Sequence, residues 1–354
     1  MRPTLATIDL SALRHNLHVA KRHAARSKVF AVVKANAYGH GVLRAARAMN
    51  DADGFAVIEL EAAVRLREAG YVQPILLLEG FFEPSELAVI VEHRLTTAVH
   101  SLEQLDMLEA LPAGSAVDVM LKLNTGMNRL GLQPPDFLPA LERLKAHSGI
   151  GTITAMTHFA NADDARGIAP QLKSFDTLVE SALPRSLANS AALLRYPESH
   201  RDWVRPGIML YGCSPFPNSI GSELDLRPAM TLESEIIALR EIEAGQSVGY
   251  GSVFTAEKPT RVGVVACGYA DGYPRHAPTG TPVLVGATLT RTLGRVSMDM
   301  LCVDLTALTE AHVGTRVVLW GEGNPVERVA EAAGTVGYEL LCALAQRVRV
   351  IERP

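Results

Sequence analysis

Lys34 stands where the apolar, β-branched segment 29–33 gives way to small and polar residues, and Tyr38 follows four positions later. A lysine at the end of a buried strand loses hydration, and burial lowers the pKa of its amine. The neutral amine is a nucleophile that can form a Schiff base. Such a lysine serves an aldolase directly or holds pyridoxal phosphate. The ordinary alternative is a strand-end lysine whose ammonium group reaches water.

Pyridoxal phosphate also needs a phosphate site, and three downstream residues are candidates for it. Ser190 lies at a predicted strand-to-helix junction, and Gly207 and Ile208 follow a later strand. Backbone N–H groups at such junctions, with a hydroxyl beside them, bind a phosphate dianion. Tyr38 could add a second hydroxyl. A helix cap or a tight turn explains each of these residues equally well when it is taken alone.

The order of strand-like and helical segments along the chain predicts the fold that positions these side chains. Eight apolar runs alternate with amphipathic helical segments over the first two thirds of the chain, which predicts a parallel sheet. Eight units are typical of a TIM (β/α)8-type barrel; a weak seventh run, residues 186–190, leaves a doubly wound sheet as the alternative. The runs end on polar residues, which a barrel would gather at one mouth: Lys34, Glu59, Glu79, His100, Lys122, His158, Asn189 and Arg205.

Beyond about residue 227 the pattern changes to short strand-like runs separated by glycine, proline and charged residues. This pattern predicts a mostly-β domain, with a helix only at 326–334. We therefore expect two domains, a barrel over 1–226 and a β domain over 227–354, although the first strand could join the β domain.

The composition is that of an ordinary soluble protein. Apolar residues make up 48% of the chain and the net charge is −4, which gives no basic footprint for nucleic acid or a membrane surface. No apolar run is long enough to span a bilayer, no signal peptide is evident, and no metal-ligand pattern stands out. Four widely spaced cysteines favour a reduced, cytoplasmic protein.

Eight motifs follow one another in the order found in the alanine racemase family, which the chain resembles from about residue 5 to its end. They are AVVKANAYGHG, LKLNTGMNRLG, MTHFA, ANSAA, RPGIMLYG, VGYGSVF, GYADGYPR and GRVSMD. The resemblance implies a TIM-like barrel followed by a β domain, pyridoxal 5'-phosphate as cofactor, and a homodimer with composite active sites.

The resemblance also implies a role for individual residues. Lys34 would hold the cofactor as a Schiff base and act as one catalytic base, and Tyr250 of the neighbouring subunit would act as the other. The cofactor would be bound by Tyr38, His158, Asn189, Ser190, Arg205, Gly207, Ile208 and Tyr338, with Arg205 at the pyridine nitrogen and His158 hydrogen-bonded behind it. Arg129 and the partner's Met298 would meet the substrate carboxylate, with Lys122, Tyr269 and Asp299 around them.

The chain departs from the family pattern at Asn124, where many members have aspartate, and at Ser186, where histidine is common. Neither change removes a catalytic group. Lys122 matches a lysine that is often carbamylated in the family, and the added negative charge would position Arg129.

The implied activity is interconversion of L- and D-alanine by proton transfer between two bases, either to supply D-alanine for peptidoglycan or to degrade alanine. Racemisation of serine or another small amino acid is an alternative. A related barrel-type decarboxylase would need a cysteine and acidic residues for a basic side chain, and that pattern is not found. A non-catalytic pyridoxal-phosphate carrier would not need the β domain that bears Tyr250.

Overall fold

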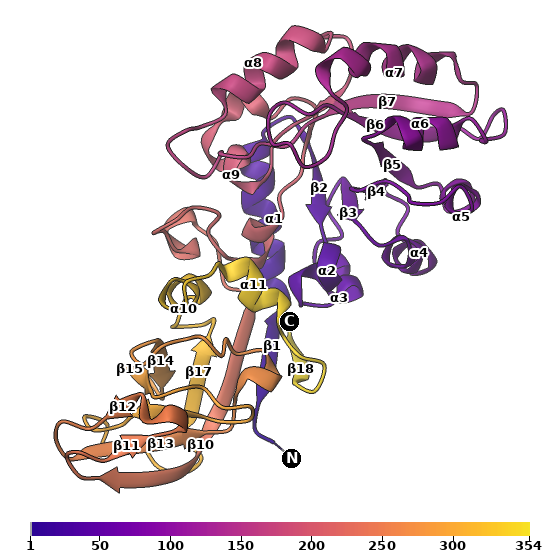
Figure 1. Ribbon diagram of the computed structural model, residues 1–354. Helices are drawn as coiled ribbons and strands as arrows, with labels where there is room; N and C mark the ends of the chain where they lie inside the picture. The colour runs from indigo at the N-terminus through magenta and orange to yellow at the C-terminus, as the bar shows by residue number, and fades with distance from the viewer. Residues whose placement is uncertain (1) are drawn as a thin grey trace.

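The computed structural model describes residues 2–354, which form a barrel and a separate antiparallel-rich sheet (Figure 1). Eight parallel strands close the barrel in chain order, and the last pairs with the first. They are β2 (Lys28–Val32), β3 (Gly54–Val57), β4 (Ile75–Leu77), β5 (Thr96–Val99), β6 (Val117–Lys122), β7 (Ile150–Met156), β8 (Arg185–Ser186) and β9 (Trp203–Val204). The predicted TIM-type barrel is confirmed, and the doubly wound alternative is wrong.

Helices follow most of the barrel strands, where the apolar periodicity predicts them. They are α3 (Val42–Ala48), α4 (Leu60–Glu68), α5 (Glu86–Glu92), α6 (Leu102–Leu108), α7 (Pro134–Ala146), α8 (Ala169–Leu178) and α9 (Ser190–Arg195). The strands between them are buried on both faces, as a helix-covered parallel sheet requires. The predicted run 204–212 is a strand only at its start, because Pro206 has no N–H group and the chain turns into a 3₁₀ helix at Ile208–Tyr211.

An eight-stranded sheet forms the second part, in the order β13-β16-β15-β14-β17-β10-β1-β18. Its strands are β1 (Leu5–Asp9), β10 (Met230–Ile242), β13 (Thr260–Val265), β14 (Pro282–Val285), β15 (Thr288–Leu293), β16 (Leu301–Asp304), β17 (Arg316–Trp320) and β18 (Arg349–Arg353). A short hairpin, β11 (Ser247–Val248) and β12 (Phe254–Thr255), and two helices, α10 (Val326–Ala332) and α11 (Gly337–Cys342), complete it. The predicted mostly-β domain is confirmed.

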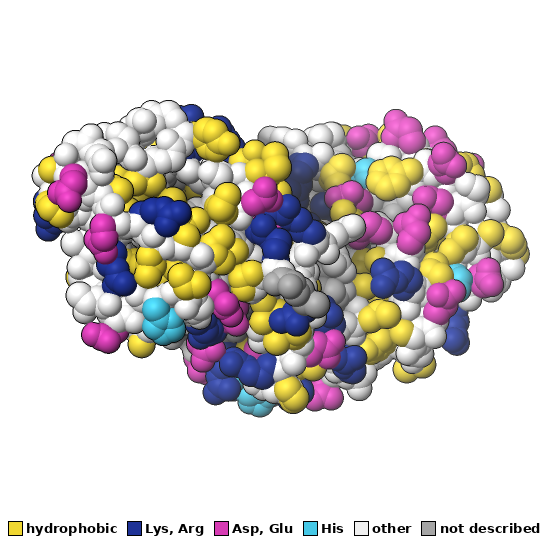
Figure 2. Space-filling model, turned by 90° about the horizontal axis from the view of Figure 1, so that it is seen from below, with side chains coloured by type: hydrophobic (Ala, Val, Ile, Leu, Met, Phe, Trp, Pro, Cys, Tyr) yellow, Lys and Arg dark blue, Asp and Glu magenta, His cyan; other side chains and the backbone are white. Residues whose placement is uncertain are grey.

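β1 opens the chain but belongs to the second sheet, antiparallel to β10 and parallel to β18. The predicted dividing line at residue 226/227 stays a prediction. No helix within residues 2–354 combines the length and apolar character needed to cross a membrane. On the face drawn in Figure 2, Lys and Arg side chains are interspersed with Asp and Glu side chains.

Helix α1 (Leu10–Ala24) joins the two parts of the molecule (Figure 1). Asp9 begins it as an N-cap whose carboxylate accepts a hydrogen bond from the Ala12 N–H at 2.9 Å. Asn16, fully buried, donates to the carbonyl oxygens of Leu210 (3.0 Å) and Arg227 (2.8 Å) and accepts from the Arg227 N–H (2.8 Å). One side chain therefore satisfies three backbone groups at the junction between barrel and sheet.

Replacing Asn16 by alanine should destabilise the protein by about 2–4 kcal/mol, because it leaves buried backbone groups without partners. Urea unfolding followed by circular dichroism measures the change. Asn50→Ala, at an exposed asparagine, is the matched control and should be close to neutral. Equal stability of the two variants would contradict the structural role given to Asn16.

His40 is fully buried against the ring of Tyr211, with centroids 4.7 Å apart. Its Nδ1 lies 2.8 Å from the Tyr38 carbonyl oxygen, and its Nε2 has no partner among residues 2–354. Burial lowers the pKa of this ring to about 4, so the folded protein holds it neutral.

The unfolded chain binds a proton at this histidine below its ordinary pKa of 6.5, whereas the folded chain does not until the pH nears 4. Stability is therefore fully present above 6.5 and lost as the pH falls from 6.5 towards 4. Between about pH 7.5 and 5 we expect His40 to account for a loss of about 2 kcal/mol. Urea unfolding of His40→Gln at both pH values should show a smaller loss than the parent protein; an unchanged loss would refute the assignment.

Candidate active site

A cavity of about 1270 Å³ opens at the ends of the barrel strands. Most residues predicted for the site line it: Lys34, Tyr38, Lys122, Arg129, His158, Asn189, Ser190, Arg205, Gly207, Ile208 and Tyr338. Two of the strand-end residues, Glu59 and His100, lie outside it; Glu79 lines it. The barrel therefore gathers most, but not all, of the polar strand ends into one site.

An unusual turn holds Lys34 and Tyr38. Ala35, Asn36, Ala37 and Tyr38 all have φ between 50° and 55°, in the left-handed region. This conformation costs L-residues roughly 1–2 kcal/mol each. Hydrogen bonds from the Ala37 N–H to the carbonyl oxygen of residue 33 (2.9 Å) and from the Gly39 N–H to Ala35 (3.1 Å) offset part of this cost.

Helix α11 closes over this turn. Gly39 follows it with φ 81°, and a Cβ there would lie 2.2 Å from the carbonyl oxygen of Leu341 in α11. Only glycine permits that approach. Helix α11 thus packs on the turn that presents Lys34.

Cations gather in the cavity. Lys122 is buried, and burial together with Arg205 and Arg129 lowers the pKa of its amine to about 8, which Glu79 partly opposes. Burial, then Arg205 and Lys122, hold the pKa of His158 well below its usual value, so its ring is neutral at pH 7. Burial lowers the pKa of Arg205 to about 10, which leaves the guanidinium protonated. Positive charge around Lys122 and Arg205 suits an anionic ligand there, while carboxylates line other parts of the cavity: Glu79, Asp163, Glu223, Glu327 and Glu331.

Arg205 is fixed by three hydrogen bonds on its guanidinium group. Nη1 donates to the Ser186 hydroxyl at 2.5 Å, and Nη2 donates to the carbonyl oxygens of Thr157 (2.6 Å) and Leu187 (3.3 Å). The hydrogen bond predicted from His158 is not among them. Every one of these partners is a neutral acceptor, so Arg205 keeps its positive charge uncompensated.

Hydroxyl and amide donors converge beside the lysine turn. The Ser190 hydroxyl accepts from the Gly207 N–H at 2.8 Å. A Cβ at Gly207 would lie 2.4 Å from the Tyr38 hydroxyl oxygen, so glycine leaves room for that group. The ring of Tyr338 lies 6.2 Å from that of Tyr38, and burial raises the pKa of both phenols. Both hydroxyls therefore remain protonated and can donate.

The side chain of Asn189, next to Ser190, hydrogen-bonds to two backbone groups. Its side-chain oxygen accepts from the Ala192 N–H at 3.0 Å and so caps α9, and its amide donates to the Phe159 carbonyl oxygen at 3.3 Å. Asn189 therefore has a structural role as the cap of α9, and its contact with the cofactor stays a prediction.

The remaining predicted site residues, Tyr250, Tyr269, Met298 and Asp299, lie in the β domain and do not line the cavity of their own chain. Tyr250 is 71% exposed, on a turn between Gly249 and Gly251, both with φ 72°. Asp299 forms an ion pair with Arg347 at 2.8 Å. A single chain therefore presents these residues outward.

Sequence reasoning missed several contributors. Ser186 stands where histidine is common in the family, and its hydroxyl contacts Arg205. Segment 213–220 lines the cavity without any motif that marks it. The polar ends of the eight strand-like runs predict Glu79 at the barrel mouth. No sequence pattern predicts that the Thr157 carbonyl oxygen accepts a hydrogen bond from Arg205. Residues 2–354 contain no cluster of three or more His, Cys, Asp or Glu side chains placed to hold a metal ion.

Comparison with known proteins agrees with this geometry. Residues 8–215 match the family model "Alanine racemase, N-terminal domain", and residues 229–352 match "Alanine racemase, C-terminal domain". The chain is 58% identical over 352 residues to a protein of Nitrosospira multiformis named alanine racemase, which covers 98% of this chain and 99% of that one. A Ralstonia pickettii protein of the same name is 54% identical over 362 residues, with 100% and 96% covered.

Solved structures give the same result. The crystal structure of biosynthetic alanine racemase from Pseudomonas aeruginosa superposes with a TM-score of 0.97 at 49% identity, covering 100% of both chains. The structure of alanine racemase from Acinetobacter baumannii gives a TM-score of 0.93 at 42% identity, also over 100% of both chains. The chain belongs to the alanine racemase family.

Proposed function

We propose that this protein interconverts L- and D-alanine with pyridoxal 5'-phosphate as its cofactor and Lys34 and Tyr250 as its two bases. The observation that carries the proposal is the convergence of Lys34, Lys122, Arg129 and Arg205 on one cavity. The relatives named alanine racemase match over the whole chain, so both parts of the predicted enzyme are present.

The residues of the cavity fit this cofactor. Its phosphate needs several donors and a close backbone approach, which the Tyr38 and Tyr338 hydroxyls and the Gly207 region offer. Lys34 would attach it covalently, and Ser190 and Ile208 would complete the phosphate site. When bound, pyridoxal phosphate supplies an electron-withdrawing ring that acidifies the Cα–H bond of an attached amino acid.

Racemisation removes a proton from one face of Cα and returns one to the other. We assign the lysine amine to one face and the Tyr250 phenol, from the partner of a homodimer, to the other. The outward position of Tyr250 supports this division, since the phenol is 71% exposed and does not line its own cavity. Two bases on opposite faces avoid any need for one base to swing around the substrate.

Arg129 would bind the substrate carboxylate, because a guanidinium is suited to that geometry. Lys122, with a pKa of about 8, has a neutral fraction near neutral pH, and a neutral amine is the form that reacts with carbon dioxide. Carbamylation of Lys122 would convert a cation of the cluster into an anion and hold Arg129 in place.

Lys34→Ala should lower the rate of racemisation by roughly 10²–10⁴-fold or more and remove the absorbance of the lysine-bound cofactor. The measurement pairs circular-dichroism assays of alanine interconversion with borohydride trapping and peptide mapping. Lys28→Ala is the control, since Lys28 starts the same strand at the opposite end of the barrel and should leave both readouts unchanged. Trapping at a lysine other than Lys34 would overturn the proposal.

Arg205 can only donate to a ring nitrogen and cannot leave a proton on it as a carboxylic acid would. This limits how much negative charge the ring accepts and favours return of the proton to Cα. Arg205→Glu should raise pyruvate formation per racemisation event by about tenfold or more, equivalent to ~1.4 kcal/mol.

Arg205→Gln is the control for this variant, because it breaks the same contacts to Ser186 and Thr157 without adding an acid. Coupled lactate-dehydrogenase assays measure the pyruvate. An equal rise in the glutamine variant would show that lost packing, not the proton on the ring, causes the side reaction.

A further inference from the structure

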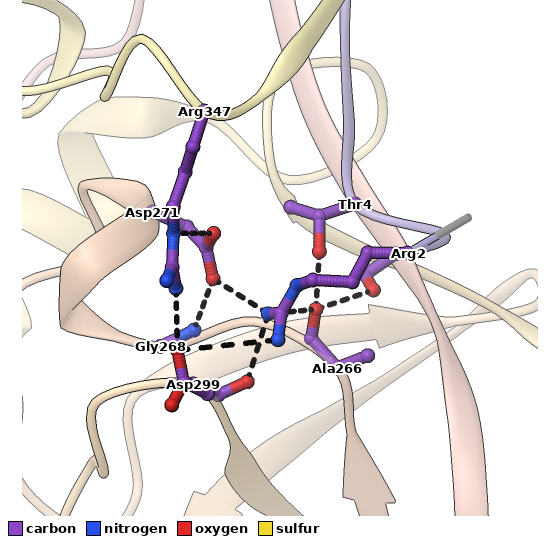
Figure 3. Close-up of polar contacts among 8 residues, drawn as sticks. Arg2, Thr4, Ala266, Gly268, Asp271, Asp299 and Arg347 are labelled. Atoms are coloured by element: carbon purple, nitrogen blue, oxygen red, sulfur yellow. Dashed lines mark hydrogen bonds and ion pairs between the residues drawn. The ribbon is translucent and has the colours of Figure 1, made fainter.

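A buried carboxylate in the β domain lies between two arginines from opposite ends of the chain (Figure 3). The Asp271 side chain is 1% exposed; its Oδ2 lies 3.0 Å from Arg2 Nη2 and its Oδ1 lies 2.8 Å from Arg347 Nε. The Gly268 N–H also donates to Oδ2, at 2.9 Å. With donors on both oxygens, the carboxylate is held in a single orientation.

The same arginines reach a second segment. Arg347 Nη2 pairs with Asp299 Oδ1 at 2.8 Å, and Arg2 Nη2 donates to the Asp299 carbonyl oxygen at 3.0 Å. Arg2 also donates to the Ala266 carbonyl oxygen at 3.1 Å, where Thr4 donates as well (Figure 3). The cluster therefore joins segment 266–271, the end of segment 297–299 and both ends of the chain.

The two segments also pack directly on each other. The Tyr269 N–H donates to the Ser297 carbonyl oxygen and the Ala270 N–H to that of Met298, both at 3.0 Å. A Cβ at Gly268 would lie 2.3 Å from the Ser297 oxygen. Segments 266–271 and 297–299 thus form one unit, which carries the exposed side chains of Tyr269 and Met298.

We propose that Arg2, Asp271 and Arg347 are positioning residues that hold Tyr269 and Met298 where they reach the active site of the partner subunit. The inference rests on the proposed composite site. None of the three lines the cavity or touches a reacting atom. Arg2 donates to Asp271 and to two backbone carbonyls, so its loss removes three contacts between these segments and the N-terminal residues, while the Thr4 hydrogen bond to the Ala266 carbonyl oxygen stays.

Because Met298 is expected at the substrate carboxylate and Tyr250 lies on a different turn, a shifted unit should weaken substrate binding more than proton transfer. For Arg2→Ala we expect a KM for alanine about five- to tenfold higher, a kcat within about twofold and unchanged cofactor absorbance. Arg2→Lys keeps the positive charge but not the Nη2 that makes all three hydrogen bonds, so its KM should lie between those of Arg2→Ala and the parent enzyme.

Arg22→Ala is the matched control, since Arg22 is 51% exposed against 44% for Arg2 and pairs with Asp225, away from both segments. It should leave KM unchanged. A KM for Arg2→Ala within twofold of the Arg22→Ala value would overturn the proposal. If Arg2→Ala does not fold, the same comparison between Arg2→Lys and the parent enzyme decides.

A mixed dimer tests whether the effect crosses the interface. One protomer carries Arg2→Ala and the other Lys34→Ala, and the heterodimer is isolated with two different affinity tags. The one site that retains Lys34 belongs to the Arg2→Ala protomer. It receives Tyr269 and Met298 from the protomer with an intact Arg2, so we expect the KM of the parent enzyme. A raised KM would place the effect within one chain and refute the proposal, whereas absence of racemisation by the parent enzyme would refute the proposed function instead.

Discussion

The burial of cations at the barrel mouth is the constraint around which this site is built. Lys34, Lys122, Arg129 and Arg205 line one cavity, and the depressed pKa values of Lys122 and Arg205 record the free-energy cost of burying charge there. The barrel tolerates this free-energy cost because its strands hold the backbone of each cationic residue in a fixed position. A dianionic ligand lowers it, so ligand affinity and local stability are coupled in this site.

The same constraint explains the division of labour between the two parts of the molecule. The barrel holds the positive charges and the lysine, whereas the β domain presents Tyr250 and Met298 outward on turns that no charge of their own cavity reaches. The Tyr250 phenol does not line the cavity of its own chain. Under the proposed function, association of two chains, and not folding of one chain, would complete the chemistry.

Local patterns in the sequence predicted the barrel, the β domain and the cavity-lining residues Lys34, Arg205 and Ser190, because strand and helix periodicity is a local property. The contacts that tune the site were not predictable in this way. The left-handed turn at 35–38 leads into Gly39, which packs against Leu341 of α11, some 300 positions away. Ser186 contacts Arg205 only because β8 and β9 are neighbours, and Asp271 gains its partners from both chain ends. Spacing alone carries no information on such tertiary proximity.

The pairing of β1 with β18 has a consequence for synthesis on the ribosome. Arg353 and Asp9, which form an ion pair at this edge, are 344 positions apart. β1 therefore has one hydrogen-bonding edge without its partner until the ribosome has added those 344 positions, and such an edge can pair with other nascent chains. The amphipathic helix α1 that follows it carries Arg14, Lys21 and Arg22 on its outer face, and early packing of its apolar face on the barrel would limit such pairing.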